Sequence, residues 1–189
     1  MFLSRDRWQA RLTTSVLLLI SLFGAGSGRA QDAENIEYKI KAAYLYNFTK
    51  FISWPPKDGA TFNICIVGAD PFGRLLDSLE TKTAQNKPIR VYRYDNLKQL
   101  KDCQIAYFDK TEPRTDPALS GVLVVGSLEK TLTVGSQAFF AEHGGMIGFV
   151  LEDEKVKLHV NLKTMKQSGL VISAKLIEVA TVITGGEHE

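Results

Sequence analysis

Short apolar runs that recur along the chain, separated by polar segments, constrain the fold most. Four of these runs have the length and composition of buried strands: residues 62–67, 88–94, 103–109 and 121–126. Segments with helix or loop character follow the first three runs. Buried strands that alternate with helices favour parallel pairing and right-handed crossovers. The pattern therefore predicts an α/β fold with a mostly parallel sheet.

The last third of the chain adds a different pattern. Residues 135–145 indicate a short helix that stops at Gly144-Gly145. Residues 146–162 alternate around the charged turn 152–154, which is typical of an antiparallel hairpin. Helices are expected at 162–168, after a capping Asn161, and at 173–181. Together these elements predict a three-layer sandwich: a mixed, mostly parallel sheet with helices on both faces and a C-terminal antiparallel hairpin.

The first 30 residues have the composition of a secretory signal peptide. Three arginines precede an apolar run of about a dozen residues, and Gly28 and Ala30 are small residues suited to cleavage after Ala30. The run is shorter than the ~20 apolar residues that span a bilayer. The alternative is an uncleaved N-terminal anchor. We expect export through a cleavable signal, with residues 31–189 as one domain that does not span the membrane once processed.

The charge of the mature chain argues against nucleic acid as a partner. The predicted signal holds four of the 23 Lys and Arg residues and one of the 21 Asp and Glu residues, so the remainder has a net charge of about −1. The basic pI of the whole chain therefore belongs to the signal, and no basic surface for nucleic acid is expected.

An unusually aromatic helix opens the mature domain, between Tyr38 and Trp54. Its apolar residues at helical spacing predict one core-facing side, made of Ile40, Ala43, Tyr44, Phe48, Phe51 and Ile52. Lys39, Lys41 and Lys50 lie off this side, and Pro55 ends the helix. Tyr38, Tyr46 and Trp54 do not all fit the same side. They indicate either an exposed protein contact or a second buried flank.

The sequence lacks the patterns of the common catalytic and metal sites. Gly68 and Gly73 bracket four residues after a strand, but Arg74-Leu75 follows where a phosphate loop needs Lys and Ser or Thr. The three histidines have no metal-binding spacing, and no Gly-x-Ser-x-Gly motif occurs. We therefore predict no catalytic, metal-binding or cofactor-binding residues, and a protein that is not an enzyme.

The two cysteines, Cys65 and Cys103, would reach an oxidising compartment after export. An even number there favours one disulfide. Two buried free thiols are the alternative, because an unpaired cysteine is often simply a small core residue.

Several segments, in this order, resemble the YfiR family of small periplasmic proteins over about residues 38–182. The most specific pieces are Lys41-Ala42-Ala43, Asn47-Phe48, Trp54-Pro55, Gly68, Asp70-Pro71-Phe72-Gly73, Gly144-Gly145, Asn161 and Gly169-Leu170 to Ser173. The resemblance implies a periplasmic regulator that binds the periplasmic part of an inner-membrane diguanylate cyclase and holds it inactive. Cyclic di-GMP and biofilm formation would then be under its control. It also implies a homodimer and an outer-membrane lipoprotein that sequesters the regulator.

The resemblance is incomplete at the cysteines. The best-known family pattern has a second cysteine pair near the late hairpin, and this chain has none between Gly144 and Asn161. Only the pair Cys65–Cys103 carries over, so redox sensing through a second bridge is not expected here.

Two functional readings follow from the whole sequence. In the first, a surface made of Tyr46, Trp54 and Pro55 contacts the cyclase. In the second, the protein is a small-ligand-binding sensor module that acts on a membrane kinase or cyclase. Its pocket would lie at the ends of the parallel strands, near Gly68 and Gly126, where such sheets commonly form clefts.

Overall fold

A computed structural model describes residues 27–56, 58–95, 100, 102–109 and 130–183, with side chains from residue 35 onward. The predicted signal peptide, the polar helix at 96–101 and the strand at 121–126 lie wholly or largely outside the described residues. The chain divides into two compact units, residues 1–36 and 37–189, and the described strands lie in the second. Helix α2 (Ser27–Phe51) begins in the first unit and continues into the second.

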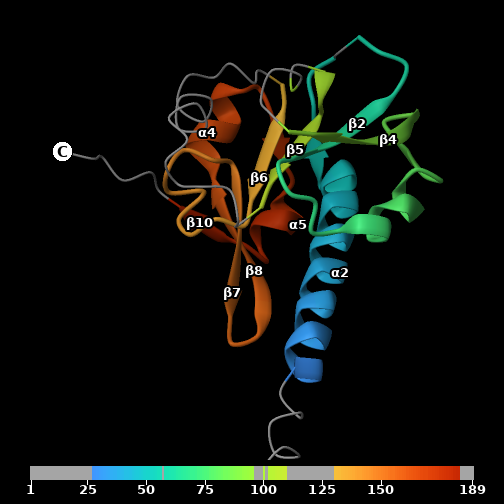
Figure 1. Ribbon diagram of the computed structural model, residues 1–189. Helices are drawn as coiled ribbons and strands as arrows, with labels where there is room; N and C mark the ends of the chain where they lie inside the picture. The colour runs from blue at the N-terminus through green and yellow to red at the C-terminus, as the bar shows by residue number, and fades with distance from the viewer. Residues whose placement is uncertain (1–26, 57, 96–99, 101, 110–129, 184–189) are drawn as a thin grey trace, which may run out of the picture. The chain divides into compact units, whose positions relative to one another are not determined.

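Eight strands form one mixed sheet in the order β10-β8-β7-β6-β5-β2-β4-β3 (Figure 1). The pairs β4–β2, β2–β5, β5–β6, β6–β7 and β8–β10 are parallel. The pairs β3–β4 and β7–β8 are antiparallel. The strands are β2 (Phe62–Val67), β3 (Thr83–Ala84), β4 (Lys87–Tyr94), β5 (Ile105–Phe108), β6 (Leu132–Gly135), β7 (Ile147–Glu152), β8 (Lys155–Asn161) and β10 (Thr181–Ile183). The predicted mixed α/β class with a mostly parallel sheet is confirmed. The exact three-layer arrangement stays a prediction.

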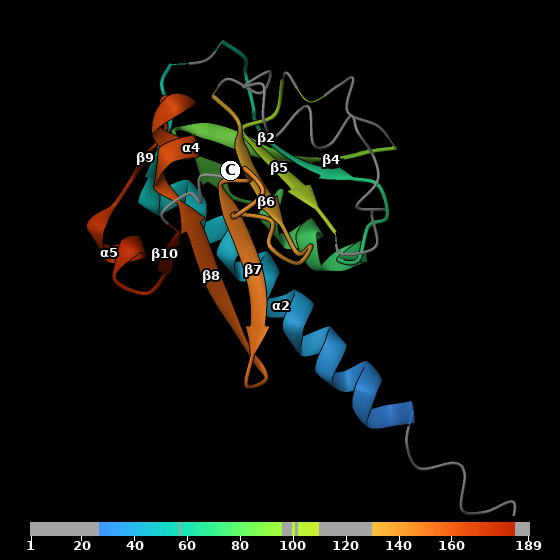
Figure 2. The same ribbon diagram turned by 90° about the vertical axis from the view of Figure 1, so that its left-hand side faces the viewer.

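The strand direction turns strongly across the sheet. Figures 1 and 2 show β2 and β4 running across the direction of β7 and β8. The two-residue turn between β7 and β8 places Asp153 and Glu154 at φ +47° and +60°. Positive φ at both central residues is the conformation of the tight turns that match the strand twist. A separate two-stranded sheet pairs β1 (Ile52–Ser53) with β9 (Val171–Ile172).

The sheet is buried on both faces, because successive side chains of its central strands enter different apolar clusters. Ile64, Ile66 and Tyr107 belong to the larger cluster, which also includes the inner side of α2. Cys65, Val67, Ala106 and Phe108 belong to a second cluster, together with Leu100, Cys103 and Phe140. This double burial explains the continuous apolar runs of β2 and β5. The predicted burial of the strand at 88–94 is wrong, because Ile89 is the one buried residue of β4.

The core-facing side of α2 differs from the prediction. Among the described side chains of α2, the buried ones are Tyr38, Lys41, Ala42, Leu45, Phe48 and Thr49, and Ile52 in β1 is buried too. Ile40 is 38% exposed and Ala43 is exposed, so their predicted burial is wrong, whereas that of Phe48 and Ile52 is confirmed. The expected outward position of Lys41 is also wrong, since this lysine is only 3% exposed. Its amine forms an ion pair with Glu37 one turn earlier, which offsets much of the cost of burial.

The helices between strands are shorter than predicted. Asp70 accepts backbone hydrogen bonds from Phe72 and Gly73, as a capping residue does, but the helix that follows is a 3-10 helix, η1 (Gly73–Leu79). Asn161 caps α4 (Leu162–Gln167) as predicted, and Ser173 caps α5 (Ala174–Ile177), which ends well before residue 181.

The segment after β6 is the largest local difference. Residues 137–144 form turns instead of the predicted helix. Phe139 has φ +59°, which no helix accommodates, and the ring of Phe140 fills the space beside Gly135 and Gly145. Strand β6 itself, four residues long, was not predicted.

Candidate functional site

A disulfide joins β2 to the segment that leads into its parallel neighbour β5. Cys65 lies inside β2 and Cys103 lies two residues before β5, with a Cα–Cα distance of 6.0 Å. Both residues are fully buried, and no described cysteine is free. The predicted disulfide is therefore confirmed, and the alternative of two free thiols is wrong.

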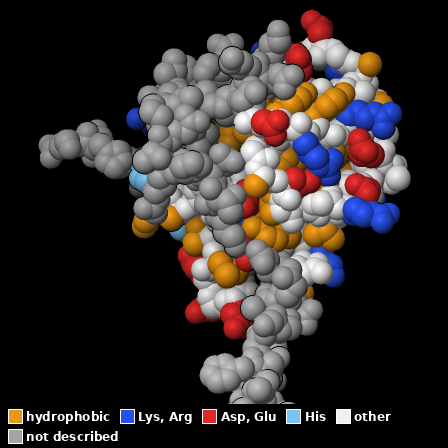
Figure 3. Space-filling view, in the orientation of Figure 1, with side chains coloured by type: hydrophobic (Ala, Val, Ile, Leu, Met, Phe, Trp, Pro, Cys, Tyr) orange, Lys and Arg blue, Asp and Glu red, His pale blue; other side chains and the backbone are white. Residues whose placement is uncertain are grey.

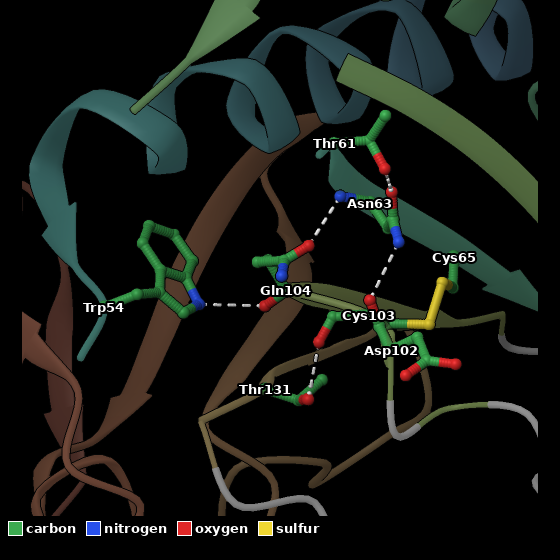
Figure 4. Close-up of a disulfide and its surroundings, with 8 residues drawn as sticks. All are labelled: Trp54, Thr61, Asn63, Cys65, Asp102, Cys103, Gln104 and Thr131. Atoms are coloured by element: carbon green, nitrogen blue, oxygen red, sulfur yellow. Dashed lines mark hydrogen bonds between the residues drawn. A yellow bond between two sulfur atoms is a disulfide. The ribbon is translucent and has the colours of Figure 1, made fainter. Parts of the chain in front are cut away.

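Hydrogen bonds fix the chain on both sides of Cys103 (Figure 4). The Thr131 hydroxyl donates to the carbonyl oxygen of Cys103 at 2.6 Å. The Asn63 side chain donates to the carbonyl oxygen of Asp102 at 2.9 Å, and its backbone N–H donates to the side-chain oxygen of Gln104 at 2.6 Å. The disulfide is thus part of a dense hydrogen-bonded layer at the amino ends of β5 and β6.

Gln104 connects this layer to Trp54. Its carbonyl oxygen accepts from the Trp54 indole N–H at 2.9 Å (Figure 4). The same oxygen accepts from the backbone N–H of Leu132 at 2.8 Å. The indole also meets the Phe62 ring edge-on, with ring centroids 5.2 Å apart. Trp54 is only 9% exposed, so the reading of Trp54 as an exposed aromatic is wrong and the buried-flank alternative holds for it.

A cavity of about 250 Å³ lies beside the buried indole. It is lined by Trp54, Pro55, Pro56, Phe62, Gln85, Lys87 and Gln104. Gln85 forms, with Asn86, the two-residue turn of the β3–β4 hairpin, where both residues have positive φ. The Trp54-Pro55 segment predicted as a contact therefore borders a hollow rather than a flat surface.

Tyr46 lies half-buried on α2 between two lysines. The Lys50 amine is 4.3 Å and the Lys82 amine 5.1 Å from the centre of its ring, both within cation–π range. Lys82 directly precedes the β3–β4 hairpin, whose Gln85 and Lys87 line the Trp54 cavity. Tyr46 therefore contacts the residue that leads into the hairpin whose turn borders the Trp54 cavity. Figure 3 shows basic and acidic side chains interspersed around β2 and β4.

A buried polar cluster that the sequence did not predict lies at the carboxyl ends of β5 and β6. One carboxylate oxygen of Asp109 accepts from the Tyr38 hydroxyl at 3.1 Å and from the Tyr107 hydroxyl at 2.9 Å. The Tyr107 oxygen also lies 2.8 Å from the Ser136 hydroxyl. Burial raises the pKa of the Tyr107 phenol above its ordinary value of 10.0, so it remains a hydrogen-bond donor at neutral pH. The cluster ties α2 to the sheet.

A second cavity, of about 300 Å³, opens beyond the carboxyl end of β6. It lies between residues 136–142 and the strands β7 and β8. His159 stands at its edge, with one ring nitrogen 3.0 Å from Glu142 and the other 3.4 Å from Glu152. Neither of these two cavities is lined by Gly68, and Gly126 lies outside the described residues, so the ligand pocket near these glycines stays a prediction.

The sequence matches the YfiR/HmsC-like family over residues 38–181. The chain belongs to this family. The match spans both cysteines, the Trp54 cavity and the second cavity. A comparison with curated proteins finds no match.

Family membership indicates a periplasmic regulator of cyclic di-GMP signalling. The family is a regulatory rather than a catalytic one and is associated with membrane diguanylate cyclases. Within the part of the chain that the structure describes, no group of three metal-binding side chains occurs and no helix is long and apolar enough to cross a membrane.

Proposed function

We propose that this protein binds the periplasmic part of an inner-membrane diguanylate cyclase and holds it in an inactive state. Membership of the YfiR/HmsC-like family is the observation that carries this proposal. Repression by contact requires only that the protein bind the inactive arrangement of its partner more tightly than the active one. Loss of the protein would then raise cyclic di-GMP and promote biofilm formation. A homodimer and a sequestering outer-membrane lipoprotein belong to the same proposal.

The contact surface that we propose consists of Tyr46, Pro55 and the mouth of the Trp54 cavity. Three observations support it. The surface combines aromatic side chains with a hollow, which suits an anchor residue of a partner. Lys50 and Lys82 flank Tyr46, and Lys87 lines the cavity. Lys130 reaches the same region, because its amine donates to the carbonyl oxygen of Pro56 at 3.3 Å. An apolar anchor flanked by acidic residues is the partner segment that fits this surface.

The Trp54 indole has a supporting role in this proposal. It forms the wall of the cavity and is fixed by Gln104, which follows the disulfide-bonded Cys103 in the chain. A rigid cavity wall reduces the conformational entropy lost on binding. The disulfide would therefore act on partner affinity through the position of Trp54.

The experiment measures cyclic di-GMP in the native bacterium with the gene deleted and then restored. Deletion should raise the level, and the full-length gene should restore it, whereas a gene without codons 1–30 should not. An unchanged level after deletion would contradict the proposal.

Point variants test the contact surface. Tyr46→Asp should weaken binding to the purified periplasmic part of the cyclase, because it replaces an aromatic contact by a charge. Tyr92→Asp is the matched control, since Tyr92 is an exposed tyrosine on β4 and lies outside the proposed surface. If both variants fold and bind the cyclase like the wild type, the proposed contact surface is wrong, while the proposal that the protein represses the cyclase is not contradicted.

A further inference from the structure

Strand β7 extends beyond the end of its neighbour β6. The pairing of β7 with β8 continues to Glu152↔Lys155 at the hairpin turn, whereas the pairing of β6 with β7 ends at Gly135↔Gly148. Figure 2 shows this end of the hairpin protruding past β6. Within the described part of the chain, residues 149–152 therefore have a strand on one side only, and their other side is a free strand edge.

The hydrogen bonds of the hairpin show which backbone groups point to this free edge. The Asn161 N–H donates to the Met146 carbonyl oxygen, so even-numbered residues of this segment face β8. Because residues alternate in direction along an antiparallel pair, Leu151 directs both its N–H and its C=O to the free side, and Phe149 directs its C=O there. Among the described residues, no group bonds the Leu151 backbone on that side.

The second cavity lies along this free edge. Three consecutive residues of β7, 149–151, line it. Successive side chains of a strand point to opposite faces, so a cavity that touches three residues in a row borders the edge of the strand rather than one face. The opposite wall comes from residues 136–139, which directly follow β6. The cavity thus occupies the place where a continuation of β6 would lie.

The free edge lacks the features that usually protect such an edge. Natural proteins place lysine, proline, an inward-pointing charge or a bulge there, which prevents pairing with another chain. Residues 149–151 are phenylalanine, valine and leucine. Leu151 is 58% exposed, and Phe139 across the cavity is 60% exposed. Two large apolar side chains therefore flank unpaired backbone groups.

These backbone groups identify the kind of occupant. The donor and acceptor of Leu151 and the acceptor of Phe149 follow the repeat of a β-strand, and an extended peptide presents complementary groups at the same repeat. In strand addition, main-chain hydrogen bonds of this kind supply affinity, and pockets for alternate side chains supply specificity. The cavity provides one such pocket. An extended peptide segment is therefore the occupant that fits.

The charge of the hairpin turn decides which segment fits best. Residues 152–154 are Glu-Asp-Glu and all three are exposed, and Figure 3 shows acidic side chains at this end of the hairpin. The two lysines of the hairpin, Lys155 and Lys157, lie on the opposite strand β8. Pairing of two copies of this chain through Leu151 would bring their acidic turns together, which disfavours a second copy. A basic segment of another protein is favoured instead.

We propose that the free edge of β7 binds an extended segment of a partner protein as an added strand. The segment pairs with the backbone of Leu151 and Phe149 and places an apolar side chain in the cavity between Phe139 and Leu151. A lysine or arginine of the segment lies near the acidic turn. This site shares no residue with the proposed cyclase contact at Tyr46 and does not depend on it. Because that contact is flanked by lysines, the two surfaces select segments of opposite charge.

The test uses short synthetic peptides in which threonine alternates with valine or leucine, with a lysine at each end. Each peptide is titrated into the oxidised, isotope-labelled protein, and backbone amide shifts are followed by NMR. The lysine peptide should shift the amides of residues 136–139 and 149–151. A peptide with glutamate at both ends should bind several-fold more weakly. The absence of shifts at 149–151, or equal binding of the two peptides, would overturn the proposal.

Backbone methylation of the peptide tests the added strand directly. Methyl groups on alternate backbone nitrogens give two forms of the lysine peptide with identical side chains. The form whose methyl groups face β7 should not bind, whereas the form whose methyl groups face outward should bind like the unmethylated peptide. Equal binding of the two forms would exclude strand addition. The same amide shifts on raising the protein concentration without peptide would assign the edge to a second copy instead.

Proline variants separate strand addition from folding. Leu151→Pro removes the N–H that points to the free edge, where proline is tolerated in a strand, and should weaken the lysine peptide about tenfold. Val150→Pro is the matched comparison, because its N–H points to Lys157 of β8, and it should lower the thermal midpoint much more. Wild-type peptide affinity of Leu151→Pro, or equal losses of stability in the two variants, would contradict the inferred direction of the backbone groups.

A charge variant tests the selection of a basic segment. Asp153→Asn removes a charge at the turn and keeps a residue that tolerates its φ of +47°. It should weaken the lysine peptide several-fold without affecting a peptide with serine at both ends. Asp77→Asn, the same change at an exposed position on η1, should bind like the wild type. An unchanged affinity of Asp153→Asn for the lysine peptide would contradict the charge selection.

Discussion

Replacing Gly135 by alanine tests how the turn after β6 is held in place. A Cβ atom at this position would lie 2.4 to 2.6 Å from three ring atoms of Phe140. Two carbon atoms attract best at about 3.5 to 4.0 Å, so these contacts are strongly repulsive. No backbone atom is among the three nearest neighbours, so the ring of Phe140 must move. Because Phe140 is almost fully buried, displacement forfeits most of its packing.

The expected loss of stability follows from the burial of Phe140. Truncating a buried phenylalanine costs about 3–5 kcal/mol, and burying its side chain contributes about 1.5–3 kcal/mol. We therefore expect Gly135→Ala to lower the free energy of unfolding by about 3 kcal/mol. In a domain of this size that corresponds to a fall in the thermal midpoint of roughly 6–12 °C. Urea unfolding followed by circular dichroism measures the first quantity, and a thermal scan measures the second.

Gly148 offers a matched control, because it pairs with Gly135 in the neighbouring strand β7. A Cβ atom there would meet its nearest neighbours, in Ala141 and His159, at 3.5 to 3.8 Å, which is ordinary contact. Gly148→Ala should therefore change stability by less than about 1 kcal/mol. In a Phe140→Ala background, Gly135→Ala should cost equally little, because its steric partner is gone. If Gly135→Ala costs no more than Gly148→Ala, or costs the same with and without Phe140, the packing argument is wrong.

Three further predictions concern stability. Replacing Cys65 and Cys103 by alanine opens a loop with a sequence separation of 38 and should cost about 4 kcal/mol, measured by urea unfolding with and without reductant. Trp54→Phe should cost only about 1 kcal/mol in the same assay, since the Gln104 carbonyl keeps its bond from Leu132. Above a pH of about 10, the folded protein keeps the Tyr107 proton that the unfolded chain loses. The free energy of unfolding that this group contributes should therefore fall by about 1.4 kcal/mol per pH unit. The Tyr107→Phe variant should lose less stability over the same pH range.

The elements that could be predicted are those whose signals are local. Strands β2, β4 and β5 were predicted because each is a continuous apolar run or an extended β-branched segment. The Asn161 cap was predicted because a side chain that bonds its own backbone three residues later needs no distant partner. The disulfide was predicted from the oxidising compartment and the even number of cysteines, and neither requires knowledge of a distant contact.

The parts that could not be predicted depend on contacts between distant segments. The face of α2 was misassigned because Lys41 looks like a solvent residue until Glu37, Tyr38 and Phe149 surround its amine. The burial of Trp54 depends on a backbone carbonyl fifty residues away, and carbonyl positions leave no trace in side-chain patterns. The cluster around Asp109 likewise joins residues 38, 107, 109 and 136, which no sequence spacing relates.

The pair Phe139-Phe140 shows how adjacent residues divide between the core and the surface. In the sequence the two are indistinguishable, and a helix would place them about 100° apart around its axis. In the structure the missing side chains of Gly135 and Gly145 admit one ring to the core, and the strained backbone at the other turns its ring outward. Phe140→Leu should therefore lower stability by about 1–2 kcal/mol through lost packing. Phe139→Asn should leave stability unchanged or raise it slightly, because Asn tolerates the left-handed backbone conformation and the Phe139 side chain is exposed. Urea unfolding of the two variants should therefore shift in different directions or by clearly different amounts.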